Sequence, residues 1–294
     1  MKEKLHSARA LYHSITQQIH YNKGEIYSIE ESRYMALMLM EHYLHYLRND
    51  ILLDRQIQLD SHQEDRLEKA IARICDHEPI QYVIGETYFY GRSLYVSPAV
   101  LIPRRETEEL TDIIIKENPQ PRLKVLDIGT GSGCIAITLS QELNSPEIHA
   151  LDSSQEALAV AKANAQQHQA VIRWYLEDIL KPTANRLSSF DIIVSNPPYV
   201  RKSEALEMKK NVLEFEPYQA LFVSDDDPLL FYRQIANLCT RQPLLNNNGC
   251  LYLEINEMYG TEVAELLDKY GFTDINLRKD LQQKDRFISA KLTF

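Results

Sequence analysis

The chain has 294 residues, of which 44% are hydrophobic and 25% charged, values that are ordinary for globular proteins. This length exceeds what one hydrophobic core usually serves, and it predicts two domains. The formal net charge of -10 counts against direct nucleic-acid binding, because broad phosphate contact draws on Lys and Arg. The first twenty residues lack a continuous apolar core and no long apolar stretch follows, so we expect a cytoplasmic protein that does not bind a membrane.

Neither the cysteines nor the histidines form a pattern typical of a metal site. The cysteines have no C-x-x-C pair and indicate no disulfide framework, so we interpret them as reduced packing residues. Seven of the nine histidines lie before residue 80, without the H-E-x-x-H pattern of a metal-binding helix, and we expect no metal. The cysteines are Cys75, Cys134, Cys239 and Cys250.

Residues 1–80 have the apolar spacing of helices and are expected to form a small all-α domain. Two S-x-x-E patterns, Ser28 with Glu31 and Ser61 with Glu64, are typical of capping boxes that open helices. The segment has thirteen acidic and ten basic residues, which is no nucleic-acid footprint. One apolar helix face is expected to consist of Leu37, Met40, Leu44 and Leu47.

Residues 81–104 are rich in aromatic and β-branched residues punctuated by glycine and proline, which predicts a β-hairpin connector. In residues 105–294, strand-like and helix-like segments alternate, which indicates an α/β domain with a mostly parallel, Rossmann-like sheet covered by helices on both faces. Ligands on such sheets bind at the carboxyl ends of the strands. The expected strands are 124–128, 147–151, 171–176, 190–194, 250–255 and 287–292, and the expected helices run through 135–143 and 156–165.

The first of these strands ends in a glycine-rich loop, VLDIGTGSGC. Its G-x-G-x-G spacing is neither the dinucleotide fingerprint nor a P-loop. Asp127, directly before the loop, would repel a pyrophosphate but suits the ammonium and sulfonium groups of S-adenosylmethionine; alternatively it only caps the strand end. The loop residues expected to contact this cofactor are Gly129, Thr130, Gly131 and Gly133.

The next two strands also end in carboxylates. Asp152 is placed to accept hydrogen bonds from both ribose hydroxyls, and Ser153 with Glu156 is expected to open the following helix. Asp178 is expected near the adenine amino group with Ile179 on the adenine face, although Asp178 could instead cap a turn or helix.

The fourth strand leads into Asn196, Pro197, Pro198 and Tyr199. Proline fixes its own φ, forces the preceding residue into an extended conformation and has no N–H, so this segment is a rigid projection rich in acceptors. The Asn196 Oδ1 and the Pro197 carbonyl would form a two-acceptor clamp for a planar NH2 group, with Tyr199 against its plane and Asn196 also bordering the cofactor. Taken alone, the segment could be only a stiff turn that ends a strand.

With these residues in place, the sequence resembles the bacterial release factor glutamine methyltransferases, the PrmC/HemK family. The resemblance covers nearly the whole chain and implies an N-terminal helical domain that contacts the release factor, joined to a class I S-adenosylmethionine-dependent methyltransferase domain. It implies N5-methylation of the glutamine in the Gly-Gly-Gln motif of class-1 release factors, with S-adenosylhomocysteine as product. Asn196 and Pro197 would then hold the glutamine amide, Tyr199 and Phe89 would shape its pocket, and Pro198 is a further expected substrate-binding residue. The segments that carry it are 78–91, 97–110, 125–137, NPPYV (196–200), FEPYQALF (215–222) and DRF (285–287).

The chain departs from the family pattern at two places. Arg105 stands where relatives usually have a proline, and we expect it to be tolerated at the first helical position. The acidic loop Asp225–Asp227 lies in a segment where relatives tend to have a glycine, so the sequence does not predict the shape of this surface loop. Glu216 could serve the site or cap nearby backbone, and Arg104 could serve the site or hold the connector through a salt bridge.

Two other functions remain open on the sequence. A methyltransferase acting on adenine N6 or guanine N2 would use the same clamp on a flipped base, although the acidic balance counts against it. A non-catalytic module whose helical domain docks a partner is also conceivable, but intact Asp127, Asp152 and Asn196 count against it.

Overall fold

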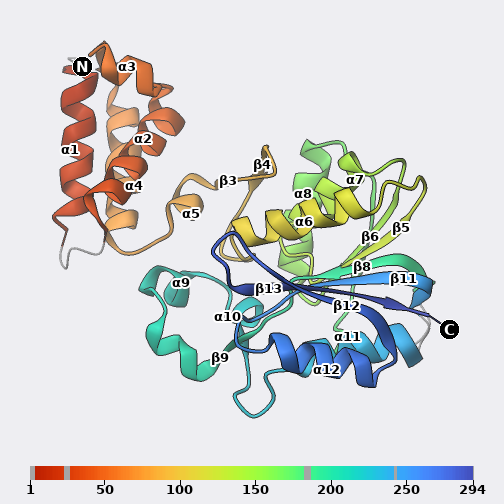
Figure 1. The fold of residues 1–294 in the computed structure, drawn as a ribbon. Helices are drawn as coiled ribbons and strands as arrows, with labels where there is room; N and C mark the ends of the chain where they lie inside the picture. The colour runs from red at the N-terminus through yellow and green to blue at the C-terminus, as the bar shows by residue number, and fades with distance from the viewer. Residues whose placement is uncertain (1–3, 23–26, 182–186, 242–243, 294) are drawn as a thin grey trace. The chain divides into compact units, whose positions relative to one another are not determined.

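The structure is a computed structural model that describes residues 4–22, 27–181, 187–241 and 244–293. It contains two compact units, shown in Figure 1. The first consists of Met1–Gly85 with Lys209–Phe215, and the second of Glu86–Met208 with Glu216–Phe294. Residues 81–85, assigned to the connector from the sequence, thus fall within the first unit.

The first unit is built mainly from three helices, α1 (Ala8–His20), α2 (Ile29–Leu44) and α4 (Ser61–Cys75), which bury one apolar cluster between them. The prediction that residues 1–80 are entirely helical is wrong in one respect. Residues 56–59 alternate exposed and buried side chains, as a strand does, and pair antiparallel with residues 4–7. The remaining elements are β1 (Lys4–Ser7), α3 (Arg48–Leu52), β2 (Gln56–Leu59), α5 (Ile80–Ile84) and α9 (Lys210–Phe215).

The expected apolar face of α2 is only partly correct. Met40 and Leu44 are buried, but α2 ends at Leu44 because His45 takes a left-handed conformation. Leu47 therefore lies beyond the helix and is 53% exposed.

One of the three predicted capping boxes is confirmed. The Ser28 hydroxyl accepts from the Glu31 N–H, and the Glu31 carboxylate accepts from the Ser28 N–H. The other two helices are capped one residue away from the predicted positions, α4 by a capping box of Asp60 with Gln63 and α8 (Gln155–Gln167) by an N-cap bond alone. Asp60 caps α4, because its carboxylate accepts from two backbone N–H groups, and Ser154 rather than Ser153 caps α8.

The second unit contains a seven-stranded sheet of order β12-β13-β11-β8-β5-β6-β7. Five neighbouring strands, β11, β8, β5, β6 and β7, are parallel to one another. Strand β13 runs antiparallel to both of its neighbours, β11 and β12. All six predicted strands are present, whereas β12 was not predicted because most of its side chains are exposed or half-buried on a polar edge strand. The strands are β5 (Lys124–Ile128), β6 (Glu147–Asp152), β7 (Ile172–Leu176), β8 (Phe190–Ser195), β11 (Leu245–Glu254), β12 (Phe272–Lys279) and β13 (Asp285–Leu292).

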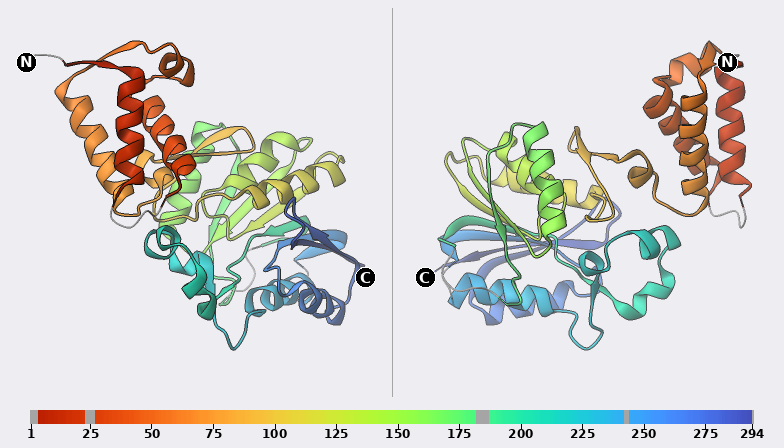
Figure 2. Two further views of the ribbon diagram at one scale, coloured as in Figure 1. Left: turned by 60° about the vertical axis from the view of Figure 1, so that its left-hand side comes forward. Right: turned by 180° about the vertical axis from the view of Figure 1, so that it is seen from behind.

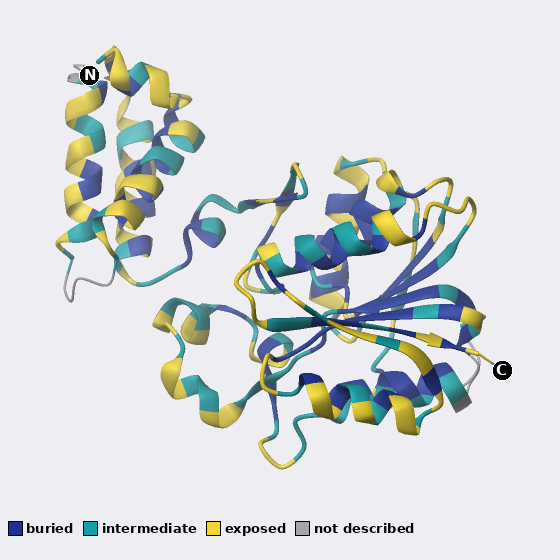
Figure 3. Cartoon of the chain, in the orientation of Figure 1, coloured by how far each residue is buried: buried dark blue, intermediate teal, exposed yellow. Residues whose placement is uncertain are grey.

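Helices cover both faces of this sheet, as Figures 1 and 2 show. Neighbouring strand residues point to opposite faces: Val125 packs with the α6–α8 layer, whereas Leu126 packs with the α11 and α12 layer. The central strands are consequently buried along most of their length (Figure 3). The helices are α6 (Arg105–Glu117), α7 (Cys134–Glu142), α11 (Leu230–Arg241) and α12 (Gly260–Lys269).

The predicted hairpin is formed by β3 (Glu86–Phe89) and β4 (Arg92–Tyr95), which pair antiparallel. Its two-residue turn, Tyr90-Gly91, has positive φ at both positions (49° and 74°), as tight hairpin turns require. The smaller elements of this unit are β9 (Val200–Arg201), the 3-10 helix Lys202–Glu207, α10 (Tyr218–Leu221) and β10 (Phe222–Val223).

Within the described residues, no helix is long and apolar enough to cross a membrane. The four cysteines have free thiols, and Cys134 and Cys239 are buried. No group of three or more His, Cys, Asp or Glu side chains in the described ranges is arranged to hold a metal ion.

Candidate active site

The predicted site residues follow strands of the central sheet at a single edge. Because β7, β6, β5, β8 and β11 run parallel, their carboxyl ends meet there. The Ser195 hydroxyl donates to the Ile128 carbonyl at 2.7 Å and so ties the ends of β8 and β5 together. The glycine loop and the Asn196 segment therefore begin at adjoining points.

The glycine loop needs its glycines for backbone geometry. Gly129, Gly131 and Gly133 all have positive φ, between 55° and 82°. A Cβ on Gly129 or Gly131 would point into open space, whereas one on Gly133 would lie 3.2 Å from the Ala161 Cβ. The first two glycines thus leave an open cradle, and the third allows α7 to pack closely on α8.

Asp127 lies fully buried at the base of this cradle. The Thr130 hydroxyl donates to Asp127 Oδ2 at 2.6 Å, and Oδ1 has no hydrogen-bond partner in the part of the chain that the structure describes. Burial raises the pKa of Asp127 to about 7, against the opposing effects of the Thr130 hydrogen bond and of the nearby Ala136 backbone N–H, which lies outside hydrogen-bond geometry. A buried carboxylate oxygen without a donor fits a cationic group, and an ammonium is the simplest one that would satisfy it.

Asp152 and Asp178 are both engaged with backbone. Asp152 accepts from the N–H groups of Gly131 and Ser154, each at 2.9 Å, and burial raises its pKa. Its oxygens keep further lone pairs for hydroxyl donors. Asp178 accepts from the Leu180 N–H, which matches the alternative interpretation as a turn cap, while Ile179 is 8% exposed and packs in the core.

Asn196 is held by a chain of hydrogen bonds. Its Nδ2 donates to the Thr107 hydroxyl oxygen at 3.0 Å, and the Thr107 hydroxyl donates to Glu254 Oε2 at 2.7 Å. Thr107 and Glu254 are 3% and 1% exposed, and burial raises the pKa of Glu254. The side-chain oxygen of Asn196, Oδ1, has no hydrogen-bond partner within the described ranges, so it is the free end of the amide.

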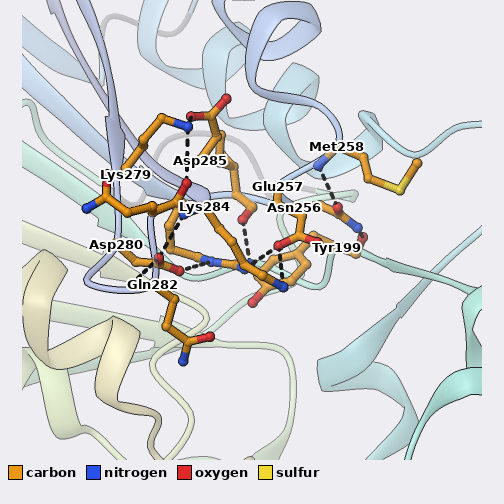
Figure 4. Close-up of polar contacts among 12 residues, drawn as sticks. Tyr199, Asn256, Glu257, Met258, Lys279, Asp280, Gln282, Lys284 and Asp285 are labelled. Atoms are coloured by element: carbon orange, nitrogen blue, oxygen red, sulfur yellow. Dashed lines mark hydrogen bonds and ion pairs between the residues drawn. The ribbon is translucent and has the colours of Figure 1, made fainter.

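Tyr199 is fastened at both ends of the residue. Its hydroxyl donates to Glu254 Oε1 at 2.9 Å, and its backbone carbonyl accepts from Asn256 Nδ2 at 3.2 Å. Burial, together with the negative charge of Glu254, raises the pKa of Tyr199 well above its usual value. Figure 4 shows Tyr199 and Asn256 beside the polar loop that joins β12 to β13. Arg286 of β13 lies here as well, donating to the Ile255 carbonyl.

The remaining residues singled out in the sequence lie in different surroundings. Phe89 is 1% exposed and packs in the core with Leu94 and Leu110, so in this structure it is a packing residue and its role in a glutamine pocket stays a prediction. Pro197 is buried, and Pro198 is half-buried.

Arg104 and Glu216 form an ion pair at 2.6 Å, and Glu216 also accepts from the Ile102 N–H. These contacts match the structural interpretations of both residues, in which Arg104 holds the connector through a salt bridge and Glu216 caps nearby backbone. Arg105 is the first residue of α6, as expected.

The shape of the acidic loop follows from two contacts. Asp225 accepts from the Ser203 N–H and hydroxyl, and Asp227 pairs with both terminal nitrogens of Arg233. The loop is therefore fastened to the segment after β9 and to α11.

Thr107 and Glu254 are the main residues that sequence reasoning missed. Thr107 lies inside the quoted segment 97–110, and Glu254 ends a buried apolar strand at the carboxyl edge of the sheet. A carboxylate at such a position was the available signal, but its partner is 147 positions away in the chain.

The parallel sheet, the glycine loop and the acidic strand ends define an S-adenosylmethionine-dependent methyltransferase. The family model described as "Methyltransferase small domain" matches residues 104–215, and "PrmC N-terminal domain" matches residues 25–85. The chain belongs to the family of release factor glutamine methyltransferases. Whereas the sequence predicted this family from its motifs, the comparisons now establish it.

Two relatives of that name match nearly end to end. The release factor glutamine methyltransferase of Flavobacterium psychrophilum is 46% identical over 91% of this chain and 94% of its own length. That of Bacteroides thetaiotaomicron is 43% identical over 94% of this chain and 98% of its own length.

Among solved structures, a methyltransferase from Pyrococcus furiosus aligns with a TM-score of 0.51 at 18% identity, covering 80% of this chain and all of that one. The 16S rRNA N2 G1207 methyltransferase of T. thermophilus aligns with a TM-score of 0.51 at 15% identity, over 70% of this chain and 49% of that one. At these identities the two alignments concern the fold alone.

Proposed function

We propose that the chain transfers a methyl group from S-adenosylmethionine to N5, the side-chain amide nitrogen, of the glutamine in the Gly-Gly-Gln motif of class-1 peptide release factors. The names of the relatives support the substrate class. The observation that carries the chemistry is the orientation of Asn196, whose NH2 is occupied by Thr107 and whose carbonyl oxygen is free.

The cradle at the end of β5 fits the cofactor on its own geometry. S-adenosylmethionine supplies an electrophilic methyl group on a sulfonium. The unpartnered Oδ1 of Asp127 would accept from its ammonium group, and the open sides of Gly129 and Gly131 allow close backbone approach. Asp152 would accept from the ribose hydroxyls with its remaining lone pairs, and Asp178 with Ile179 would border the adenine.

The Asn196 segment would hold the glutamine amide. The Asn196 Oδ1 and the Pro197 carbonyl would accept its two N–H donors, and Tyr199 would lie against its plane with Pro198 beside it. Holding both protons directs the nitrogen lone pair toward the methyl group, so the contribution of these residues is orientation and electrostatic stabilisation. The methylated nitrogen is cationic and acidic, and its surplus proton can leave to water without a strong base.

The first unit would provide recognition of the protein substrate. It matches the N-terminal domain model of this family, and its acidic balance does not suit a nucleic acid. In this proposal the helical unit binds the body of the release factor, and the second unit receives the glutamine.

The test is a labelling assay with methyl-labelled S-adenosylmethionine and a release factor, run beside the same factor with its Gly-Gly-Gln glutamine changed to glutamate. Label on the first factor and none on the second is expected. Absence of label on the glutamine, with cofactor binding shown separately, would refute the proposal. Transfer to a DNA or RNA oligonucleotide, with steep loss of activity as salt rises, would instead indicate a nucleic-acid methyltransferase.

A further inference from the structure

The orientation of the Asn196 amide is determined by two buried residues that would not touch the substrate. Asn196 follows β8, Thr107 lies in the first turn of α6, and Glu254 ends β11. From this arrangement we infer that Thr107 and Glu254 are positioning residues, which keep the Asn196 oxygen toward the substrate and its NH2 group away from it. This inference rests on the proposed role of Asn196 in holding the glutamine amide.

The number of protons available in this chain of hydrogen bonds determines its direction. A threonine hydroxyl has one proton to donate. Glu254 receives a hydroxyl on each of its oxygens and lies near the cation of Arg286, which opposes the effect of burial on its pKa, so both oxygens act as acceptors. Since the Thr107 proton is used on Glu254, the Thr107 oxygen can only accept from its other neighbour. Of the two ends of the Asn196 amide, only Nδ2 can donate, so Nδ2 must face Thr107 and Oδ1 must face away.

Tyr199 supports the same polarity. Its hydroxyl donates to the second oxygen of Glu254, and its raised pKa keeps it a protonated donor at neutral pH. Glu254 thus receives one hydroxyl proton on each oxygen, from α6 and from the segment after β8. Thr107 and Glu254 are almost fully buried, so water is poorly placed to replace either hydrogen bond.

A reversed amide would present NH2 to the NH2 group of the substrate, and two donors that face each other cannot bond. The buried Thr107 oxygen would then also lose the hydrogen bond that it accepts from the Asn196 NH2 group. The fixed orientation therefore selects a substrate that donates, such as a carboxamide. It rejects a carboxylate of similar shape, which could only place acceptors against the Asn196 oxygen.

The decisive comparison is Thr107→Val against Thr107→Ser. Valine keeps the shape and removes the hydroxyl, whereas serine keeps the hydroxyl. For methylation of the release factor we expect Thr107→Val to lower kcat roughly 10- to 100-fold while the cofactor Kd changes less than twofold. Thr107→Ser should stay within about threefold of the wild type. A folded Thr107→Val enzyme with wild-type kcat, or a Thr107→Ser enzyme as slow as the valine variant, would overturn the inference.

A second measurement does not depend on turnover. In 15N-labelled protein, the side-chain amide protons of Asn196 are assigned by their loss in Asn196→Ala. In the wild type we expect one of the two protons to be protected from exchange with water by its bond to Thr107. This protection should disappear in Thr107→Val and persist in Tyr199→Phe, which removes a donor from the same carboxylate without breaking the bond to Asn196.

These outcomes separate the inference from the proposed function. If the wild type labels no release factor, the proposed function fails, yet the exchange of the Asn196 protons still decides how the amide is held. If the valine variant does not fold, the wild-type measurement alone suffices: two unprotected Asn196 protons would overturn the inference, and one protected proton supports it.

Discussion

The buried carboxylate of Asp127 predicts a specific dependence of cofactor affinity on pH. In the cofactor-free protein its pKa is raised to about 7 by burial. A bound ammonium favours the ionised form, so binding should lower this pKa and affinity should rise with pH until Asp127 is ionised. The change that tests this is Asp127→Asn, which keeps the side-chain shape and removes the titration.

The expected size follows from the ionised fraction. With a pKa of about 7, roughly one molecule in eleven has an ionised Asp127 at pH 6, and nearly all do at pH 8. Affinity should therefore weaken by about tenfold at pH 6, which corresponds to about 1.4 kcal/mol. Between pH 5.5 and 7 the ligand ammonium, with an ordinary pKa of about 8, stays protonated and does not contribute to the slope.

The assay is isothermal titration calorimetry of S-adenosylmethionine across pH 5.5 to 7, in two buffers with different ionisation enthalpies. The wild type should release close to one proton on binding at pH 6, and Asp127→Asn should release fewer and bind weakly with a flatter slope. Asp152 also has a raised pKa, and the comparison between the two proteins removes its contribution. Equal slopes in both proteins, or affinity that falls as pH rises, would refute the reasoning.

The same pKa predicts an effect on the stability of the cofactor-free protein. A pKa raised above the unfolded value contributes stability that is full below about pH 4 and is lost as pH rises through about 7. Asp127→Asn should therefore gain stability relative to the wild type between pH 5 and 8, measured by thermal unfolding. A constant difference across this range would contradict the raised pKa.

Three further substitutions test other parts of the structure. Asn196→Ala should abolish methyl transfer while the cofactor Kd changes little, and unchanged turnover would overturn the clamp. Gly133→Ala should lower the free energy of unfolding by about 2–4 kcal/mol, because a Cβ there crowds α8 and the backbone also has a strained positive φ. Gly131→Ala has the positive φ without the crowding and should lower the free energy of unfolding by only about 1 kcal/mol. Equal losses in denaturant unfolding would contradict this. Arg104→Met should lower the free energy of unfolding by about 1–3 kcal/mol, because it leaves the buried Glu216 without its ion-pair partner. In a double-mutant cycle, adding Glu216→Gln should restore part of this stability. Strictly additive effects would indicate that the two residues are not coupled.

Much of the second unit could be predicted from local sequence. Apolar and β-branched runs with helical segments between them indicated the parallel sheet, because strands buried on both faces need continuous apolar residues. The positions of Asp127, Asp152 and Asn196 at one edge followed from the rule that parallel strands share a carboxyl edge. The polar edge strand β12 lacked that apolar signal and was missed.

Helix starts were predicted less well, and the reason is geometric. Ser61 and Asp60 are both good caps, and only the backbone path decides which one faces the free N–H groups of α4. The same competition between neighbouring serines placed Ser154 rather than Ser153 at the start of α8.

The sequence by itself determined which candidate site residues lie near the sheet edge: the glycines of the loop, the acidic strand ends and the amide between a strand and two prolines. Each of these signals is local, within a few positions of a strand end. Only the tertiary structure decided how Asn196 is held. Its partner Thr107 is 89 positions away in the chain, and Thr107 in turn bonds to Glu254, from which it is separated by 147 positions. Hydrogen-bond polarity is a property of the whole buried network, and no short stretch of the chain contains it.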